Sequence, residues 1–299
     1  MKKSIALITA LATLAAHAAP VGIASGQPTG TNYPMAADIV DVCSTPASPI
    51  KNVISDGSLD NIAKIYGDKN SQYGIIQADA LEFQKGQDPK MMDRILMVFP
   101  FFSTEMHIVL KDGSPLTSLA QLAGKNVVEG PEGSGTWVSV QVIKSLTGIK
   151  WNTILASQQA GFDQVMSGKA DAEFIVAGAP IGMLQKASGF KLMPLQHPAL
   201  DKFGLYTKAI LPSGTYTSVK GTTQTYKVDN VLATYAFKNQ FQAEIGELVT
   251  CLTKNIGKLQ SGSNYHAKWR DVDPLDINRI TWPSHPAAVA AIKRASSKK

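Results

Sequence analysis

A glycine-rich stretch between residues 125 and 136 carries the clearest chemical signal in this 299-residue chain. It reads Lys125-Asn-Val-Val-Glu-Gly-Pro-Glu-Gly-Ser-Gly-Thr136, a short apolar strand followed by a turn and by the start of a helix. The first N–H groups of a helix have no partner within it, and the helix dipole favours negative charge there. The stretch therefore predicts a socket in which the N–H groups of Ser134, Gly135 and Thr136 bind a carboxylate or another small anion. A tight turn with a helix cap is the alternative, purely structural interpretation.

The elements that would position this socket alternate between strand and helix patterns. Such alternation predicts an α/β fold with mostly parallel sheets flanked by helices. The predicted strands cover residues 20–24, 50–54, 73–77, 95–100, 106–111 and 172–176. The predicted helices cover residues 32–43, 59–66, 78–85, 136–147, 161–167 and 231–259. The segment 192–224 lacks periodicity, and we expect it to be the return crossing between two lobes.

Small and polar residues follow the carboxyl ends of several predicted strands. Ligands of open α/β sheets bind outside these strand ends, so we expect the binding residues there. They are Ser25, Gly26, Thr31, Asn32, Ser58 and Gln77 on one wall, with Ser134, Gly135, Thr136 and Gly178 on the other. Tyr33 is expected to stack on the apolar part of a ligand or to donate its hydroxyl, although packing on the first helix would also explain it. Ser58 is also expected to be the N-cap of the helix at 59–66.

The N-terminus has the pattern of a secretory signal peptide. Lys2 and Lys3 precede an apolar run over residues 5–16, and Ala16-His17-Ala18 fits a small-residue cleavage site. Residues 1–18 are therefore expected to be removed and the rest exported to the periplasm. A mature chain of this length can bury a large core, most naturally as two lobes.

The formal charge of +6 is concentrated at the two ends of the chain. Lys2 and Lys3 belong to the predicted signal peptide, and Lys293, Arg294, Lys298 and Lys299 lie at the C-terminus. Without these residues the chain has as many basic as acidic side chains. Nucleic-acid binding, which needs basic residues clustered on a folded face, is therefore not expected.

The two cysteines, Cys43 and Cys251, allow two interpretations. In an exported protein they could form one disulfide that joins the first helix to a late helix. Two buried free thiols are the alternative, because spacing alone does not establish the geometry of a disulfide.

Signatures of enzymes are missing from the sequence. The glycine-rich stretch lacks the lysine of a phosphate-binding loop, and the nucleophile elbow Gly-x-Ser-x-Gly does not occur. The histidines do not have the spacing of metal ligands, so neither a metal site nor a cofactor is expected. Glu105 and His107 lie on one face of a predicted crossing strand, where a hinge hydrogen bond is expected rather than a catalytic pair.

The order of these motifs resembles the solute-binding receptors of TRAP transporters, in the TAXI branch. Six segments carry the resemblance across nearly the whole mature chain. They are residues 25–34, 57–61, 73–79, 101–109, 119–125 with 130–136, and 168–172 with 178–180. They include Gly57-Ser-Leu-Asp-Asn61 and Tyr73-Gly-Ile-Ile-Gln-Ala-Asp79. One departure lies in the first loop, where Gln27, Pro28 and Asn32 stand in place of the paired glycines and tyrosines usual in the family.

This resemblance implies a type II periplasmic-binding-protein fold with a ligand cleft between two lobes. Residues 19–105 with 205–299 would form one lobe, and residues 106–204 the other. The implied protein is no enzyme but a monomeric receptor that captures a small anionic solute, an amino acid or organic acid, and delivers it to membrane transporter subunits. An ABC-importer receptor of the same fold is the first alternative. An exported hydrolase or transferase with an unrecognised site is the second.

Overall fold

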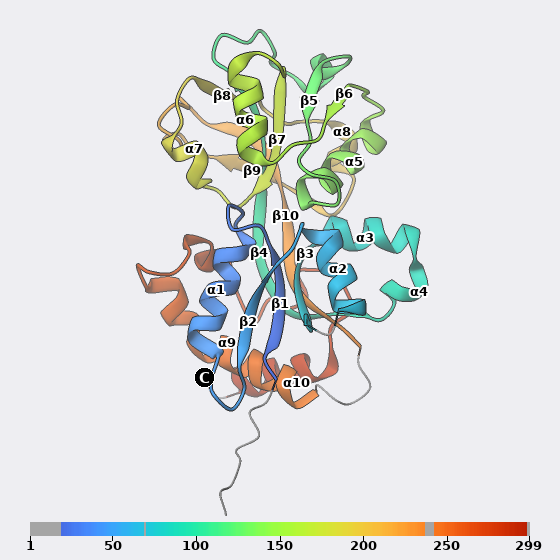
Figure 1. The fold of residues 1–299 in the computed structure, drawn as a ribbon, viewed down its shortest axis with the longest axis vertical. Helices are drawn as coiled ribbons and strands as arrows, with labels where there is room; N and C mark the ends of the chain where they lie inside the picture. Colours follow the sequence, from blue (N-terminus) through green and yellow to red (C-terminus); the bar gives the residue numbers. More distant parts are fainter. Residues whose placement is uncertain (1–18, 69, 237–241, 298–299) are drawn as a thin grey trace, which may run out of the picture.

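One ten-stranded sheet runs through both halves of the molecule (Figure 1). The computed structural model describes residues 19–68, 70–236 and 242–297. The predicted signal peptide, residues 1–18, lies outside the described residues. The strands are β1 (Val21–Gly26), β2 (Ile50–Ile54), β3 (Tyr73–Gln77), β4 (Ile95–Lys111), β5 (Asn126–Val128), β6 (Asn152–Ile154), β7 (Ala172–Ala177), β8 (Phe190–Leu192), β9 (Tyr206–Leu211) and β10 (Thr223–Tyr235).

Helices cover the sheet in both halves (Figure 1). The α-helices are α1 (Asn32–Cys43), α2 (Ser58–Gly67), α3 (Ala78–Gln87), α4 (Pro89–Met92), α5 (Gly135–Thr147), α6 (Gln158–Ser167), α7 (Gly182–Lys186), α8 (Pro198–Asp201), α9 (Gln242–Ser261) and α10 (Pro286–Ser296). Two 3₁₀ helices are η1 (Leu119–Leu122) and η2 (Ala267–Asp271). Among the described residues, no helix combines the length and the apolar character that a membrane crossing requires.

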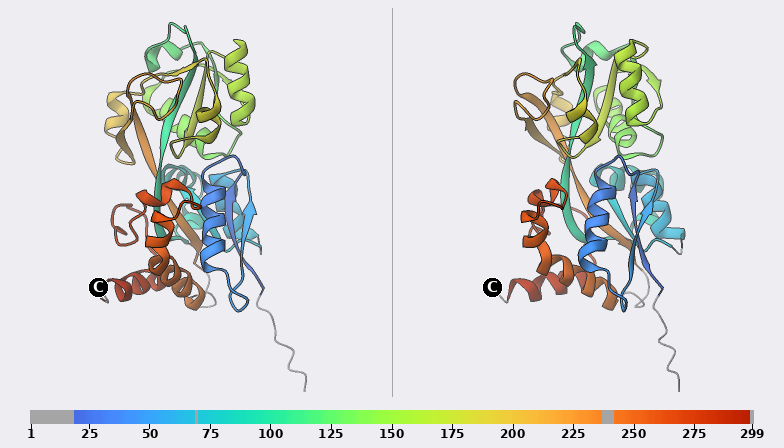
Figure 2. Two further views of the ribbon diagram at one scale, coloured as in Figure 1. Left: turned by 90° about the vertical axis from the view of Figure 1, so that its left-hand side faces the viewer. Right: turned by 60° about the vertical axis from the view of Figure 1, so that its left-hand side comes forward.

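The molecule has two lobes stacked along its long axis (Figures 1 and 2). We call the part with β1–β3, α1–α4 and the C-terminal helices the first lobe, and the part with β5–β9 and α5–α8 the second lobe. The strand order is β2-β1-β3-β10-β4-β7-β5-β6, with β9 on β10 and β8 on β4. The outer strands of each lobe pair in parallel, whereas β4 and β10 pair antiparallel with their neighbours. The predicted α/β class, with helices flanking mostly parallel outer strands in two lobes, is confirmed.

Strands β4 and β10 link the lobes (Figure 2). The prediction of two strands at 95–100 and 106–111 is wrong, because β4 is continuous over 17 residues. Pro100 is the last residue of the first predicted strand, and proline has no N–H for the ladder. The structure accommodates this proline where the register of β10 shifts between Asp229 and Val231, opposite Pro100.

The C-terminal half also differs from the sequence prediction. Residues 231–235 complete β10 instead of starting a helix, and the helix of this region is α9. The return crossing is β10, not the segment 192–224, which contains α8 and β9. The lobe boundaries expected at residues 105 and 205 stay a prediction, and β9 lies in the second lobe beside the first half of β10 (Figure 1).

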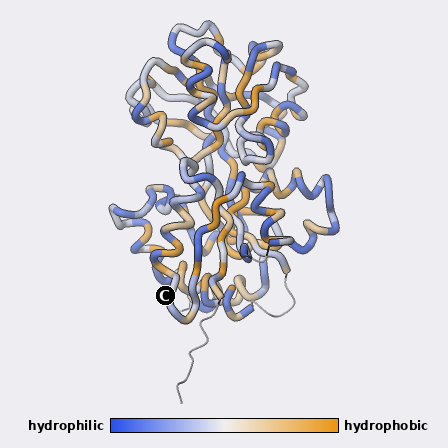
Figure 3. The backbone as a smooth tube through the Cα atoms, viewed as in Figure 1, coloured by the Kyte–Doolittle hydropathy of each residue, from blue (hydrophilic) through white to orange (hydrophobic). Residues whose placement is uncertain are grey.

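The most apolar stretches follow the central strands (Figure 3). In the first lobe, one face of α1 packs Met35, Ala36 and Ile39 into a cluster that also receives Phe99 and Trp269. The stripe on α9 enters the same cluster through Ile245, Leu248, Val249 and Leu252. These helices bury about one side each, as the spacing of their apolar residues predicted.

A disulfide joins α1 to α9. Cys43 and Cys251 are bonded, with their Cα atoms 5.9 Å apart, and they lie 208 positions apart in sequence. Of the two interpretations left open by the sequence, the structure therefore shows the bonded one. The bond closes a very long loop, so its removal enlarges the conformational freedom of the unfolded chain.

Replacing both Cys43 and Cys251 by alanine should lower the free energy of unfolding by about 3–5 kcal/mol, because the unfolded chain regains the entropy of the open loop. Urea unfolding followed by circular dichroism measures this change. The wild-type protein with a reductant should unfold at the same urea concentration as the variant without one. An unchanged midpoint for the double variant would contradict this account.

Candidate functional site

A cavity of about 140 Å³ lies between residues of both lobes. Its lining includes every predicted site residue except Tyr33 and Gly178: Ser25, Gly26, Thr31, Asn32, Ser58, Gln77, Ser134, Gly135 and Thr136. The structure therefore brings together loops that are distant in sequence, at the carboxyl ends of β1 and β3 and at the start of α5. Their role in binding a ligand stays a prediction.

The two predicted residues outside the lining have other contacts. The carbonyl of Tyr33 accepts a hydrogen bond from Asn52 Nδ2 at 2.9 Å. The N–H of Gly178 donates to Thr31 Oγ1 at 2.9 Å, which joins the two lobes directly. Gly178 therefore holds Thr31, a residue of the cavity lining, against the second lobe.

The predicted socket at the start of α5 has two main-chain donors available. Ser134 is the N-cap, with its hydroxyl accepting from Trp137 N at 3.2 Å, and its own N–H donates to Pro131 O. Gly135 and Thr136 are the first two helical residues, so their N–H groups have no carbonyl partner within α5. The hydroxyl of Thr136 accepts from Val176 N at 3.0 Å and fixes the helix against β7.

On the first lobe, Ser58 is placed differently from its prediction as an N-cap. It is the first residue of α2, and Gly57, with a φ of 119°, occupies the capping position. The Ser58 hydroxyl accepts from Gln77 N at 3.3 Å. The predicted cap was wrong because the chain turns into the helix one residue earlier, through a conformation that glycine adopts readily.

The lobes are in contact around the cavity. Leu59 N–H donates to Gly133 O at 3.1 Å, and Gln77 Nε2 donates to Ser139 Oγ at 3.3 Å. A Cβ on Gly57 would lie 2.8 Å from Ser134 Cα, which is closer than such atoms can approach. The structure is thus a closed arrangement, and it requires glycine where the backbones meet.

A buried carboxylate strengthens this closed arrangement. Asp79 on α3 accepts hydrogen bonds from Ser139 Oγ at 2.5 Å and from Tyr206 OH at 2.9 Å, and both donors belong to the second lobe. Burial raises the pKa of Asp79 to about 6. The charged form, which accepts these bonds best, therefore prevails at neutral pH.

Glu105 and His107 occupy the crossing strand as the sequence suggested. Glu105 accepts from Ala179 N at 2.7 Å and pairs with Lys268 Nζ at 2.6 Å. His107 Nε2 lies 2.8 Å from Tyr216 OH, and burial lowers the pKa of His107 to about 4, so the ring is neutral. Neither side chain lines the cavity, and both connect β4 to its neighbours.

Sequence reasoning missed several lining residues, of which Glu173, Thr104 and Asn230 are buried. Glu173 was overlooked because Ala172, Phe174 and Val176 alternate around it as an apolar strand. A charged residue inside such a short strand was the available signal. Burial raises the pKa of Glu173 to about 9, with a smaller effect from the charge of Asp163.

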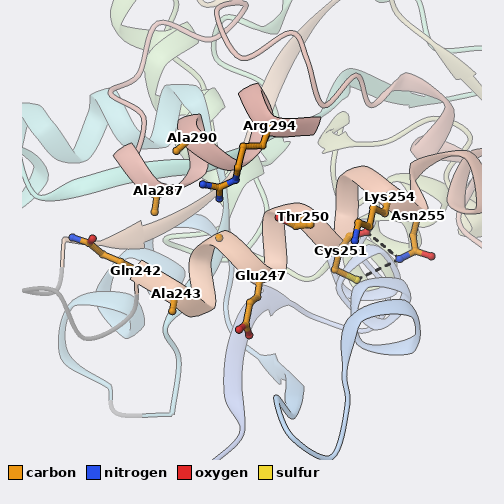
Figure 4. Close-up of a pocket in the computed structure, with 11 residues that line it drawn as sticks. Gln242, Ala243, Glu247, Thr250, Cys251, Lys254, Asn255, Ala287, Ala290 and Arg294 are labelled. Atoms are coloured by element: carbon orange, nitrogen blue, oxygen red, sulfur yellow. Dashed lines mark hydrogen bonds between the residues drawn. The ribbon is translucent and has the colours of Figure 1, made fainter. Parts of the chain in front are cut away.

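A larger hollow of about 690 Å³ lies between α9 and α10 (Figure 4). These helices lie at the end of the first lobe that faces away from the second lobe (Figure 1). Gly246, Ala287 and Ala290 line it together with Arg294. Of the predicted ligand-binding and disulfide residues, only Cys251 lines this hollow. Among the described residues, no group of three or more His, Cys, Asp or Glu side chains could hold a metal ion.

The raised pKa of Glu173 predicts a pH dependence of stability. The folded value is about 9 and the ordinary value 4.5, so the folded protein binds an extra proton between these pH values. The contribution of Glu173 to the free energy of unfolding is then full below about pH 4.5. It falls as pH rises, by at most about 1.4 kcal/mol per pH unit. Glu173→Gln should flatten this fall in urea-unfolding curves between pH 5 and 9, whereas Asp163→Asn, which removes only the smaller of the two causes, should change it much less. Parallel curves for wild type and Glu173→Gln would contradict the assignment.

Comparison with known proteins agrees with this architecture. A periplasmic transporter superposes with a TM-score of 0.56 at 12% identity, covering 93% of each chain. The periplasmic binding protein BugD gives 0.56 at 10% identity, covering 93% of this chain and 94% of BugD. The sulfonate-binding protein SsuA from Methylobacillus flagellatus KT gives 0.51 at 15% identity, covering 94% and 86%. At such identities these likenesses show the fold alone. The NMT1-like family model matches residues 23–293, and this chain therefore belongs to the NMT1-like family.

Proposed function

We propose that this protein is an extracytoplasmic receptor that captures a small carboxylate-bearing solute between its lobes and delivers it to a membrane transporter. The observation that carries the proposal is the cavity shared by both lobes, with the N–H groups of Gly135 and Thr136 at its wall. Helix N-termini of this kind bind anionic groups through main-chain donors and the helix dipole. Among the described residues, neither a nucleophile with its base nor a metal cluster lines the cavity.

The cavity is small. Its volume of about 140 Å³ suits a compact solute such as an amino acid or an organic acid. Polar side chains of the first lobe, such as Asn32 and Gln77, would then fix the orientation of the solute.

Closure of the lobes supplies the mechanism of capture. A solute held by α5 on one side and by the loop after β1 on the other contacts both lobes only when they are together. It therefore shifts the population toward the closed state. The hydrogen bonds from Gly178 to Thr31 and from Ser139 to Asp79 form in that state and add to its stability.

The transporter that receives the solute is proposed to be of the TRAP type. The six TAXI-like motifs support this partner, as does the predicted export of the chain into the periplasm. An ABC importer is the alternative partner. Genes for large membrane-transport subunits beside this gene would favour the TRAP partner, and a gene for an ATP-hydrolysing subunit would favour the ABC importer.

The socket can be tested by a pair of substitutions at Gly135. Both Gly135→Ala and Gly135→Pro place a Cβ where Gln77 Oε1 now lies, but only proline removes the N–H. The backbone tolerates the proline, because Ser134 has φ −67° and ψ 160° and position 135 is the first of the helix. A thermal-shift screen of amino acids, organic acids and sulfonates first identifies a ligand. By isothermal titration, Gly135→Pro should then bind it at least about tenfold more weakly than Gly135→Ala, as expected for a hydrogen bond to a charged group. Equal affinities would remove the socket from the mechanism.

Closure can be tested at Gly57. An alanine there collides with the backbone of Ser134 in the opposite lobe, so Gly57→Ala should hold the lobes apart. Gly113→Ala is the matched control, because Gly113 also has a positive φ of 80° but no atom within 4 Å of its added Cβ. Both substitutions should cost about 1 kcal/mol of stability through backbone strain. Only Gly57→Ala should raise the radius of gyration that small-angle scattering measures with ligand present. It should also weaken ligand binding more than about tenfold, which is equivalent to about 1.4 kcal/mol. A compact, fully binding Gly57→Ala variant would refute the closure mechanism.

A further inference from the structure

The cavity has an uneven distribution of charge. None of the described residues that line it is a lysine, an arginine or a histidine, whereas Asp56 and Glu173 are both carboxylic acids. The donors for a carboxylate are therefore main-chain N–H groups and uncharged polar side chains, which carry only partial charge. A solute with two negative charges would have no full counter-charge in this lining and would face Glu173.

Glu173 is the lining carboxyl group that is buried without a hydrogen-bond donor from the described residues on one of its oxygens. It is 1% exposed, and its Oε2 has no hydrogen-bond partner in the part of the chain that the structure describes. The carboxyl lies close to Gly161 on α6 and Val128 on β5, neither of which offers a side-chain donor. Asp163 on α6 is the titratable group that acts on it, and its negative charge gives no compensation.

The other buried glutamate of the second lobe shows the contrast. Glu129 accepts hydrogen bonds from Trp151 Nε1 at 2.6 Å and Thr153 Oγ1 at 2.7 Å, and it pairs with Lys144. Buried carboxyl groups normally have such partners, because an unpaired one is costly. The unpartnered carboxyl of Glu173 faces a ligand cavity, which suggests that its partner belongs to the ligand.

Asn230 provides an independent second acceptor on the same cavity. Its Nδ2 donates to Phe102 O at 3.2 Å and Thr104 Oγ1 at 3.3 Å, and a carbonyl can only accept, so the orientation of the amide is fixed. The Oδ1 atom has no partner among the described residues, although the side chain is fully buried. Asn32 Oδ1, which belongs to another lining residue, likewise has no partner among the described residues. Three acceptors thus lack donors at a cavity that offers main-chain donors elsewhere.

We propose that the solute is an amino-group-bearing carboxylic acid, and that Glu173 accepts hydrogen bonds from its ammonium group. This inference rests on the proposed function, since the carboxylate of the same solute is the group bound at the start of α5. Asn230 Oδ1 supplies a further acceptor for the ammonium or for a polar side chain of the solute. The receptor would accordingly discriminate amino acids from organic acids of the same size and shape.

Binding of the solute changes the protonation of Glu173. In the closed structure, burial raises the pKa of Glu173 to about 9, so this carboxyl is protonated at pH 7. The arriving ammonium keeps its own proton and stabilises the carboxylate, so the carboxyl proton leaves to the solvent. Binding should therefore release close to one proton per solute at pH 7, and affinity should rise with pH, by up to about tenfold per unit below pH 9.

The experiment compares matched ligands on the wild-type protein. The twenty standard amino acids are screened by thermal shift, together with the deaminated and the 2-hydroxy carboxylic acids that correspond to them. The best amino acid is then titrated calorimetrically at pH 7 in two buffers of different ionisation enthalpy, which gives the number of protons released. Support requires that this amino acid bind at least about tenfold more tightly than its deaminated analogue, as for a hydrogen bond to a charged group, and release close to one proton.

Glu173→Gln is the decisive variant, because glutamine has the shape of the protonated acid but cannot ionise. It should bind the amino acid about 10- to 100-fold more weakly and release no proton, while Asp163→Asn, an exposed charge removal on α6, should stay within about threefold of wild type. The inference is overturned if the deaminated acids bind as tightly as the amino acid, or if Glu173→Gln keeps wild-type affinity. In both cases the receptor for small carboxylates would stand. If no carboxylic acid of either set binds the wild-type protein, the proposed function falls together with the inference.

Discussion

The pairing of β4 with β10 is the constraint on which the rest of the structure depends. These antiparallel strands run side by side from the pair Ile95–Tyr235 in the first lobe to the pair Glu105–Lys227 at the second. Because their main-chain hydrogen bonds are satisfied by each other, the chain passes twice between the lobes without leaving buried polar groups unpaired. Arg279 adds side-chain bonds to Asp229 Oδ1 at 2.7 Å and Phe101 O at 2.6 Å at the crossing.

The parts of the fold that local sequence determines were predictable. The helix at 32–43 and the strands at 50–54 and 73–77 have the predicted bounds, since each combines a regular apolar pattern with a clear end signal. Predictions failed where a long-range partner overrides the local pattern. Pro100 sits inside a strand because β10 shifts register beside it, and residues 231–235 are a strand because β3 and β4 flank them. Neither partner is visible from the local residues.

The candidate site was also predictable only in part. Glycines and hydroxyl-bearing residues at strand ends predicted the cavity, because the fold class alone brings strand ends together. The uses of individual side chains depended on packing that the sequence does not encode locally. Thr136 is engaged by Val176 N, and Ser58 by Gln77 N, so both hydroxyls hold the walls in place. Glu173 escaped notice because only the tertiary structure reveals that it is buried without a partner.

The bond between Cys43 and Cys251 has a consequence for how the molecule is assembled during synthesis. A ribosome makes residue 43 long before residue 251, and everything in the second lobe is made in between. The second lobe is one uninterrupted stretch that can acquire its shape as soon as it is complete. The first helix must wait for a late helix before its covalent partner exists. The lobe that begins the chain is therefore the last to be finished, and a product truncated before residue 251 cannot make the cross-link at all.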